Sequence, residues 1–149
     1  MSIVNADITN INKVVELGIL LFPHETFDKL FDLYKKILTS DNEFLLLYKK
    51  GNVFAGYLHL SIRNDYVNGT DTSPVAFIEA IYVLPDYRRQ GIGKEFIGHA
   101  EMFARKHGIS QLASDCFIDN HLSEVFHKNC GFIEKERVIC FVKNVECVE

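Results

Sequence analysis

Apolar residues near the N-terminus recur every three or four positions, which is the spacing of one face of a helix. A short strand at residues 3–6 precedes a first helix, which begins at Ile11 after a capping Thr9 or Asn10 and ends before Pro23. The second helix has an apolar face made of Phe27, Leu30, Phe31, Tyr34, Ile37 and Leu38. We therefore expect a pair of helices at the start of the chain.

The middle of the chain carries longer apolar runs separated by turn residues. Residues 43–49 and 53–62 flank a Gly-Asn turn, which predicts a β-hairpin with a bulge at Gly56. A polar loop over residues 63–74 separates this hairpin from a further apolar run at residues 75–83. These segments predict neighbouring antiparallel strands.

Helix and strand patterns alternate in the remainder. A helix after Gly93 has its buried face at Phe96, Ile97, Ala100, Phe103 and Ala104. A strand is expected at residues 111–115, then a helix from Asp119 or Asn120, and last strands within residues 132–142. The inward side chains of that later helix are expected to be Leu122, Val125 and Phe126. This order predicts an α/β fold with a mixed, mostly antiparallel central sheet and helices on both faces.

Composition narrows the class of protein. With 149 residues and 48% hydrophobic content, the chain suits one domain spanning residues 1–149. A net charge of −4 without a long basic run disfavours nucleic-acid binding. The four cysteines follow neither a metal-binding nor a disulfide-framework spacing, and no apolar stretch reaches the ~20 residues of a membrane span. We expect a cytoplasmic protein with no metal and no membrane partner.

A basic, glycine-bearing turn lies between the strand at residues 75–83 and the helix that follows. Arg88, Arg89 and Lys94 supply positive charge, and Gly91 and Gly93 allow the backbone to approach an anion. The turn lacks the GxxxxGK[ST] pattern and the third glycine of GxGxxG, which disfavours ATP and NAD. It is therefore expected to bind another pyrophosphate.

The pattern Arg88-x-x-Gly91-x-Gly93 after a strand resembles the motif of the GCN5-related N-acetyltransferase (GNAT) superfamily. The stretches Ser61–Arg63, Tyr66–Val75 and Ala113–Asp115 further resemble the aminoglycoside 6′-N-acetyltransferases, and within them the short, dimeric type. The resemblance covers nearly the whole chain. It implies the GNAT fold, acetyl-coenzyme A as cosubstrate, an aminoglycoside as acceptor and a homodimer.

The resemblance assigns coenzyme contacts to three parts of the chain. Backbone groups of Ile81, Tyr82 and Val83 would pair with the pantetheine arm, and Asn120 would contact the coenzyme farther along. The pyrophosphate would be held by Arg88, Arg89, Gln90, Gly91, Ile92, Gly93 and Lys94. The side chains of the pantetheine-binding strand are expected to be buried core.

Acetyl transfer to an amine requires removal of a proton from the ammonium group and is helped by protonation of the leaving thiolate. Glu79 and Asp115 lie in or after neighbouring strands and should face one cleft, where either accepts the proton or binds the ammonium group; a solvated carboxylate explains each equally well. The resemblance places His127 where many family members carry a tyrosine that acts as general acid. A surface histidine is the alternative interpretation. His24, His59, His99, His107 and His121 are expected to be surface or packing residues.

A polycationic acceptor needs carboxylates and an aromatic surface. In relatives, positions matching Phe22, Tyr66 and Glu136 contact the antibiotic, the last from a partner subunit, and Glu79 and Asp115 join them as substrate-binding residues. Core packing remains the alternative for Phe22. Relatives often carry tryptophan there, whereas this chain has none, so stacking is expected without an indole hydrogen bond.

Two other functions fit the same residues. One is acetylation of another small polyamine or of a protein amine. The other is a non-catalytic coenzyme A sensor, which the proton-transfer candidates Glu79, Asp115 and His127 disfavour, because a sensor needs only the phosphate turn.

Overall fold

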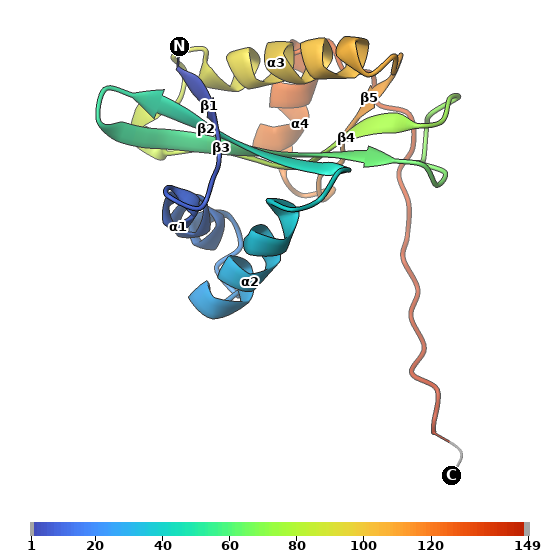
Figure 1. The fold of residues 1–149 in the computed structure, drawn as a ribbon. Helices are drawn as coiled ribbons and strands as arrows, with labels where there is room; N and C mark the ends of the chain where they lie inside the picture. The colour runs from blue at the N-terminus through green and yellow to red at the C-terminus, as the bar shows by residue number, and fades with distance from the viewer. Residues whose placement is uncertain (1, 148–149) are drawn as a thin grey trace. The chain divides into compact units, whose positions relative to one another are not determined.

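The computed structural model describes residues 2–147 (Figure 1). These residues divide after Asp115 into two compact units. The first unit contains a five-stranded sheet and three helices, α1 to α3. The second contains the helix α4 (His121–Asn129) and residues 132–147, which are called the C-terminal segment below. The expectation of one domain over residues 1–149 stays a prediction.

The sheet has the strand order β1-β2-β3-β4-β5, so neighbours in space are neighbours in sequence. The strands are β1 (Ile3–Asn5), β2 (Glu43–Lys50), β3 (Val53–Arg63), β4 (Val75–Val83) and β5 (Leu112–Ala113). All pairs are antiparallel except β4 with β5. The predicted mixed, mostly antiparallel sheet is thus confirmed, although β5 is shorter than the expected 111–115.

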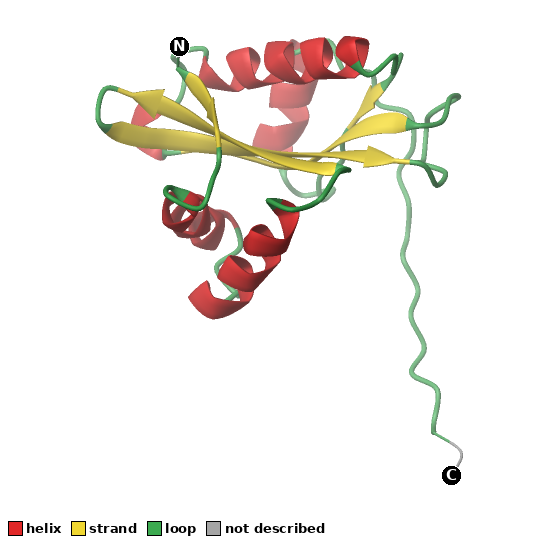
Figure 2. Ribbon diagram, in the orientation of Figure 1, coloured by secondary structure: helices red, strands yellow, loops and turns green. Residues whose placement is uncertain are grey.

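Helices cover both faces of this sheet, as expected (Figure 2). The pair α1 (Ile11–Leu21) and α2 (Phe27–Ile37) packs on one face, where buried Val14 and Leu30 meet Leu47 and Tyr57. The other face is covered by α3 (Ile92–Lys106), whose Ala104 packs with Ala76 of β4. The apolar faces that the sequence predicts for α1, α2 and α3 are therefore the faces that pack on the two sides of the sheet.

The two N-terminal helices begin in different ways. The hydroxyl oxygen of Thr26 accepts a hydrogen bond from the Lys29 N–H at 3.3 Å and so caps α2. Asn10 precedes α1 as predicted, but among the described residues its side-chain oxygen accepts from the Asp7 N–H, at 2.7 Å, and not from the helix. The residue expected to cap α1 therefore closes the preceding turn.

Strand periodicity divides β3 into an apolar and a polar side. Leu58 and Leu60 are fully buried, and Ile62 packs with the α3 layer. Side chains of the alternate positions point to the face that α1 and α2 cover, and beyond Tyr57 they are His59, Ser61 and Arg63. A row of polar groups thus lies on the inner face of a strand.

Two irregularities in strand pairing shape the centre of the sheet. The pairing of β2 with β3 shifts between Tyr48 and Lys49, next to Gly56, which confirms the predicted bulge. The pairing of β3 with β4 shifts between His59 and Leu60, so that Glu79 is the extra residue of β4. A bulge re-aims side chains, and here Glu79 and its neighbour Ala80 line the same cavity.

The second unit differs from the sequence prediction. The expected strands in residues 132–142 are wrong for this structure, because residues 132–147, all described, form no strand pairing. The expectation that Leu122 and Val125 point inward is also wrong, since they are 80% and 56% exposed. A single nine-residue helix among the described residues of this unit cannot bury an apolar face without a partner surface.

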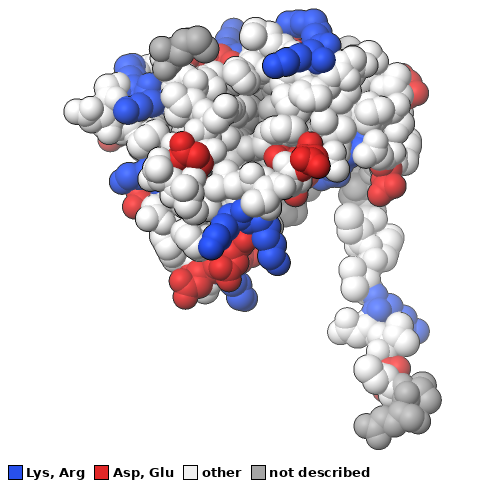
Figure 3. Space-filling model, in the orientation of Figure 1, with Lys and Arg blue, Asp and Glu red and all other residues white. Residues whose placement is uncertain are grey.

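The face seen in Figure 3 mixes the two signs of charge. Acidic and basic side chains lie side by side over α2, which exposes Asp28, Lys29, Asp32, Lys35 and Lys36. Within residues 2–147, no helix has both the length and the apolar character needed to cross a bilayer.

Candidate functional site

A cavity of about 260 Å³ opens between the α1–α2 pair and the inner face of the sheet. It is lined by Phe22, Glu25, Lys29, Leu30, Leu33, Tyr34, His59, Glu79 and Ala80. Phe22 is 40% exposed and directly follows α1. The aromatic ring and Glu79, both predicted substrate-binding residues, therefore share one cavity.

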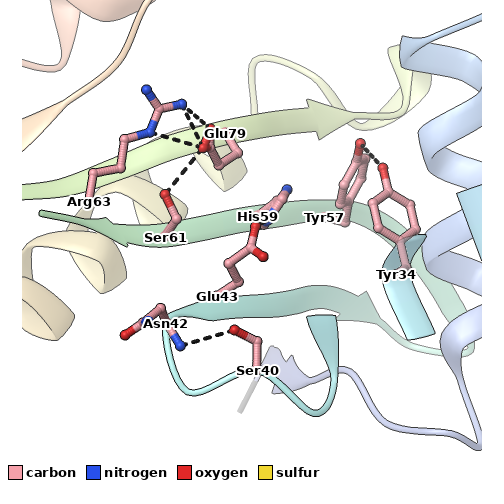
Figure 4. Close-up of polar contacts among 9 residues, drawn as sticks. All are labelled: Tyr34, Ser40, Asn42, Glu43, Tyr57, His59, Ser61, Arg63 and Glu79. Carbon is pink, nitrogen blue, oxygen red and sulfur yellow. Dashed lines mark hydrogen bonds and ion pairs between the residues drawn. The ribbon is translucent and has the colours of Figure 1, made fainter. Parts of the chain in front are cut away.

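An ion pair holds the Glu79 carboxylate at the edge of this cavity (Figure 4). The Arg63 guanidinium donates to both carboxylate oxygens, with Nη2–Oε2 at 2.7 Å and Nε–Oε2 at 3.2 Å, and the Ser61 hydroxyl donates to Oε2 at 3.2 Å. The guanidinium also lies 3.6 Å from the centre of the Phe77 ring. Glu79 is thus oriented by donors from the polar side of β3, and an incoming cation must compete with Arg63.

A second carboxylate holds His59. The Nε2 atom of His59 lies 3.0 Å from Oε1 of Glu43, and the imidazole is 9% exposed. Burial lowers the pKa of His59, while the hydrogen bond to Glu43 and its charge partly oppose that shift. A neutral imidazole next to a carboxylate donates through Nε2, which leaves the Nδ1 lone pair as an acceptor.

Two tyrosines form the deeper wall behind His59. The hydroxyls of Tyr34 and Tyr57 are 3.0 Å apart, and the Tyr34 ring meets the His59 ring edge-on with centroids 6.3 Å apart. Burial raises the pKa of both phenols, so they stay neutral and satisfy each other's hydroxyl. The His59 ring is therefore packed in a fixed orientation.

Tyr66 lies in a second hollow. Its side chain is 73% exposed on the loop between β3 and β4, and it lines a cavity of about 470 Å³ with Ile62, Arg63, Asn64 and Asp65. Arg63 lines this second cavity and its partner Glu79 lines the first. The ion pair therefore stands between the two hollows, and each holds one of the predicted aromatic contacts.

The register of the parallel strands brings the two predicted carboxylates to equivalent positions. Phe77 of β4 pairs with Ala113 of β5, and Glu79 and Asp115 each follow that pair by two residues. Asp115 is exposed, and Glu79 is held in the bulge. Both carboxylates thus follow the paired part of β4 and β5, but Asp115 does not line the cavity that contains Glu79, so the shared cleft stays a prediction.

The C-terminal part of β4, which includes Glu79, has one unpaired edge. Within the first unit, β5 pairs with β4 at Ala76 and Phe77, so the β4 edge opposite β3 has no strand partner from Ile78 to Val83. Unpaired N–H and C=O groups on such an edge can hydrogen-bond an extended ligand. Ile81, Tyr82 and Val83, predicted to bind pantetheine through their backbone, lie on this edge.

The basic turn leads from that edge into α3. Gly91 precedes the helix with a φ of 84°, and Arg89 has a φ of 61°, so the turn contains two left-handed residues. The first N–H groups of α3, at Ile92, Gly93 and Lys94, have no intrahelical acceptor. The turn therefore combines helix N–H groups with cationic side chains, which suits a pyrophosphate.

Side chains of the turn fall into two groups. Arg88 donates through Nε to the Val83 carbonyl oxygen at 2.8 Å. Gln90 donates through Nε2 to the Asp86 carbonyl oxygen at 3.3 Å, and its Oε1 accepts from Lys50. The side chain of Ile92 is buried. Arg89 and Lys94 are exposed. Lys50 is a further cation at this turn that the sequence motif does not reveal.

The remaining predicted residues lie in the second unit. Asn120 caps α4 by accepting from the Ser123 N–H at 3.2 Å. Nδ1 of His127 lies 2.7 Å from the carbonyl oxygen of Ser123, so this ring nitrogen donates to the preceding turn of α4. Glu136 is exposed in the C-terminal segment.

Within residues 2–147, no group of three or more histidine, cysteine, aspartate or glutamate side chains is arranged to hold a metal ion. The geometry of the described residues comprises a basic turn at the start of α3, an unpaired strand edge and a cavity that contains Glu25 and Glu79, all on or next to β4.

The model of the acetyltransferase (GNAT) family matches residues 11–132, which include β4, the basic turn and α4. The chain belongs to the GNAT acetyltransferase family. As a GNAT acetyltransferase, it presents the basic turn between β4 and α3 at the position that the family resemblance predicted.

Relatives of this GNAT acetyltransferase share one description. An aminoglycoside N(6′)-acetyltransferase type 1 from Acinetobacter genomosp. 13 is 41% identical over 85% of this chain and 86% of the relative. The enzyme of that description from Acinetobacter baumannii is 37% identical over 97% of this chain and 99% of its own. A solved structure of AAC(6′)-Iy in complex with the bisubstrate analogue CoA-S-monomethyl-acetylneamine has a TM-score of 0.92 and 34% identity, covering 96% of this chain and 97% of that one.

Sequence reasoning missed part of the polar network in this GNAT acetyltransferase. Ser61 and Arg63 were noticed as part of a resemblance, without a role, and His59 was expected at the surface or in packing. His59 is buried but also lines the cavity with Glu79. The alternation of polar and apolar residues along β3 is the signal that places His59, Ser61 and Arg63 on one face.

Proposed function

We propose that the chain is an aminoglycoside 6′-N-acetyltransferase, which transfers the acetyl group of acetyl-coenzyme A to the 6′-amine of an aminoglycoside and so confers resistance. The observation that carries this proposal is the layout of β4. Its bulge aims Glu79 into an acidic, aromatic-lined cavity, and its unpaired edge leads directly to the basic turn. The curated relatives carry the same activity in their names.

The coenzyme is assigned to the edge and the turn. The backbone of Ile81 to Val83 would pair with the pantetheine arm, and the N–H groups at the start of α3 would bind the pyrophosphate with the exposed cations Arg89 and Lys94. The choice of coenzyme A as ligand is supported by a relative, AAC(6′)-Iy, whose structure was solved in complex with a CoA-derived bisubstrate analogue. Asn120 is proposed to contact the coenzyme beyond the turn.

The acceptor is assigned to the acidic side of the sheet. Glu79 and Asp115 hold ammonium groups, Phe22 and Tyr66 supply flat apolar surfaces, and Glu136 adds a carboxylate. The neutral amine attacks the thioester carbonyl carbon, a C–N bond forms, the C–S bond breaks, and the nitrogen gives up one further proton, which balances the proton that the thiolate takes. His127 is proposed to act as the general acid that gives the departing thiolate a proton.

Purified protein should release coenzyme A from acetyl-coenzyme A in the presence of kanamycin or tobramycin, measured with a thiol reagent. A matched aminoglycoside with a hydroxyl at the 6′ position is the control, because it keeps the polycation and removes the accepting amine. Equal release with both compounds, or faster transfer to spermidine or a lysine peptide, would contradict the aminoglycoside assignment. Coenzyme binding without any transfer would identify a sensor.

We further propose that the enzyme is a cytoplasmic homodimer. Apolar side chains of the C-terminal segment are exposed in the single chain, at 75% for Ile133, 80% for Ile139 and 87% for Phe141. A run of exposed apolar residues suits a segment that is covered by a second copy of the chain. The cysteine spacing favours a compartment that keeps thiols reduced.

Sedimentation velocity should show a dimer of the 17.1 kDa chain, and truncation after Phe132 should convert it to a monomer. The double substitution I139K/F141K tests the same surface without shortening the chain. A monomeric parent protein, or a truncated protein that remains dimeric, would contradict the proposal.

A further inference from the structure

The cavity contains a histidine that the proposed reaction has not used. His59 is held from one side by Glu43 of β2 and faces Tyr34 of α2, and it lines the same cavity as Glu79. In Figure 4 its second ring nitrogen points away from the Glu43 carboxylate. A carboxylate that fixes one ring nitrogen so that the other is an acceptor is the arrangement of a general base.

Glu79 is poorly placed to receive a proton. Its two oxygens already accept from the Arg63 guanidinium, and one also accepts from the Ser61 hydroxyl. Such a carboxylate keeps its charge and can attract an ammonium group, but its lone pairs are largely occupied. The ammonium group therefore meets a fixed negative charge at Glu79 and needs another acceptor for its proton.

We propose that the Glu43–His59 pair is the proton acceptor of the transferase, with Glu79 as the charge that holds the ammonium group. The inference rests on the proposed amine acetylation. The N⁺–H bond of the substrate breaks, and an N–H bond forms at Nδ1 of His59, directly or through one water molecule. The resulting imidazolium is neutralised by Glu43, and the proton then leaves to solvent after the product departs.

The surroundings of His59 suit this cycle. Burial disfavours the charged imidazolium and lowers the pKa, so the ring is in the accepting form at neutral pH. The charges of Glu43 and Glu79 raise the pKa, and that of Arg63 lowers it. The other titratable groups that line the cavity or pack against the ring are Tyr34, Tyr57, Glu25 and Lys29.

The closing experiment measures kcat and KM across roughly pH 5 to 9 for the parent and for H59Q, with coenzyme A release as the readout. We expect H59Q to lower kcat roughly 100-fold with little change in KM, and to remove the acid limb of the pH profile. H99Q, which changes a histidine of α3 on the opposite side of the sheet, is the matched control and should behave as the parent.

Two further variants separate proton transfer from packing. In E43Q the acid limb should move to lower pH, because the charge that raises the His59 pKa is gone, whereas in R63Q it should move to higher pH. A purely structural role would not produce opposite shifts. ¹⁵N spectra of histidine-labelled protein should show Nε2–H in the parent at neutral pH and a mixed tautomer in E43Q.

Coenzyme A binding and the thermal midpoint verify that each variant is folded. An active, folded H59Q, or an unchanged acid limb in E43Q and R63Q, overturns the inference; if H59Q does not fold, the other two variants decide. A parent protein that acetylates no amine overturns the proposed function together with the role of His59. If the parent acetylates amines and H59Q is equally active, only the role of His59 is overturned, and the proposed function stands.

Discussion

Gly56→Ala should destabilise the protein by about 3 kcal/mol and weaken coenzyme binding at the same time. A Cβ atom at this position would lie 2.6 Å from the Tyr82 carbonyl oxygen and 3.4 Å from the Val83 Cα. These are backbone atoms of the strand proposed to bind pantetheine, so β4 must move away from β3. Urea denaturation measures the loss of stability, and calorimetry measures coenzyme A binding.

Gly98→Ala is the matched control. This glycine lies in α3, and apart from its chain neighbours and the nearby backbone of α3, no atom of residues 2–147 lies within 4 Å of a Cβ built on it. Alanine should therefore stabilise the helix by about 1 kcal/mol and leave coenzyme binding unchanged. If G56A is as stable as the parent, the close approach of β3 to β4 is not a constraint; if G56A is destabilised but binds coenzyme normally, the edge of β4 is not the pantetheine site.

The sequence predicted most helices and strands of the first unit, because each strand there pairs with a strand that is next to it in the sequence. The helix pair, the β2–β3 hairpin, β4 and the basic turn all follow from spacing, turn residues and glycine, and the sheet order equals the sequence order. Glu79 and Asp115 were expected to share a cleft, and the parallel register places them at equivalent positions. Local spacing is sufficient where strands pair with the strand next in the chain.

The ion pair of Arg63 with Glu79 and the contact of His59 with Glu43 could not be predicted from the sequence. Whether Arg63 meets Glu79 depends on the bulge at Glu79, which changes the face to which that side chain points. Likewise, His59 reaches Glu43 across a diagonal of the sheet, since the residue opposite it is Leu45. Such contacts depend on which residues of neighbouring strands lie opposite one another, and this register cannot be read from a single sequence.

The C-terminal strands failed as a prediction for a different reason. The continuous apolar run at residues 138–142 indicates a strand, but a strand forms only when another strand pairs with it. In the described single chain, this segment has no pairing partner, and its apolar side chains are exposed. The pattern itself is sound and is the basis of the proposed dimer.

Glu79→Gln should lower kcat/KM for an aminoglycoside roughly 100-fold, which corresponds to about 2.7 kcal/mol. The substitution removes the negative charge that holds the ammonium group. It also leaves the Arg63 guanidinium without its carboxylate partner at the edge of the cavity, where it repels a polycation. The effect should lie mainly in KM, because the proton acceptor assigned here is His59. Steady-state kinetics with saturating acetyl-coenzyme A separates the two constants.

The double variant E79Q/R63Q identifies the source of that loss. If the unpaired guanidinium repels the substrate, removal of Arg63 should restore kcat/KM roughly tenfold relative to E79Q, so the two substitutions are not additive. R63Q alone keeps Glu79 and should bind the polycation at least as tightly as the parent, since the competing cation is gone. If the kcat/KM of the double variant is lower than that of E79Q, Arg63 contributes directly to substrate binding. A kcat loss in E79Q as large as that expected for H59Q would return the role of proton acceptor to Glu79.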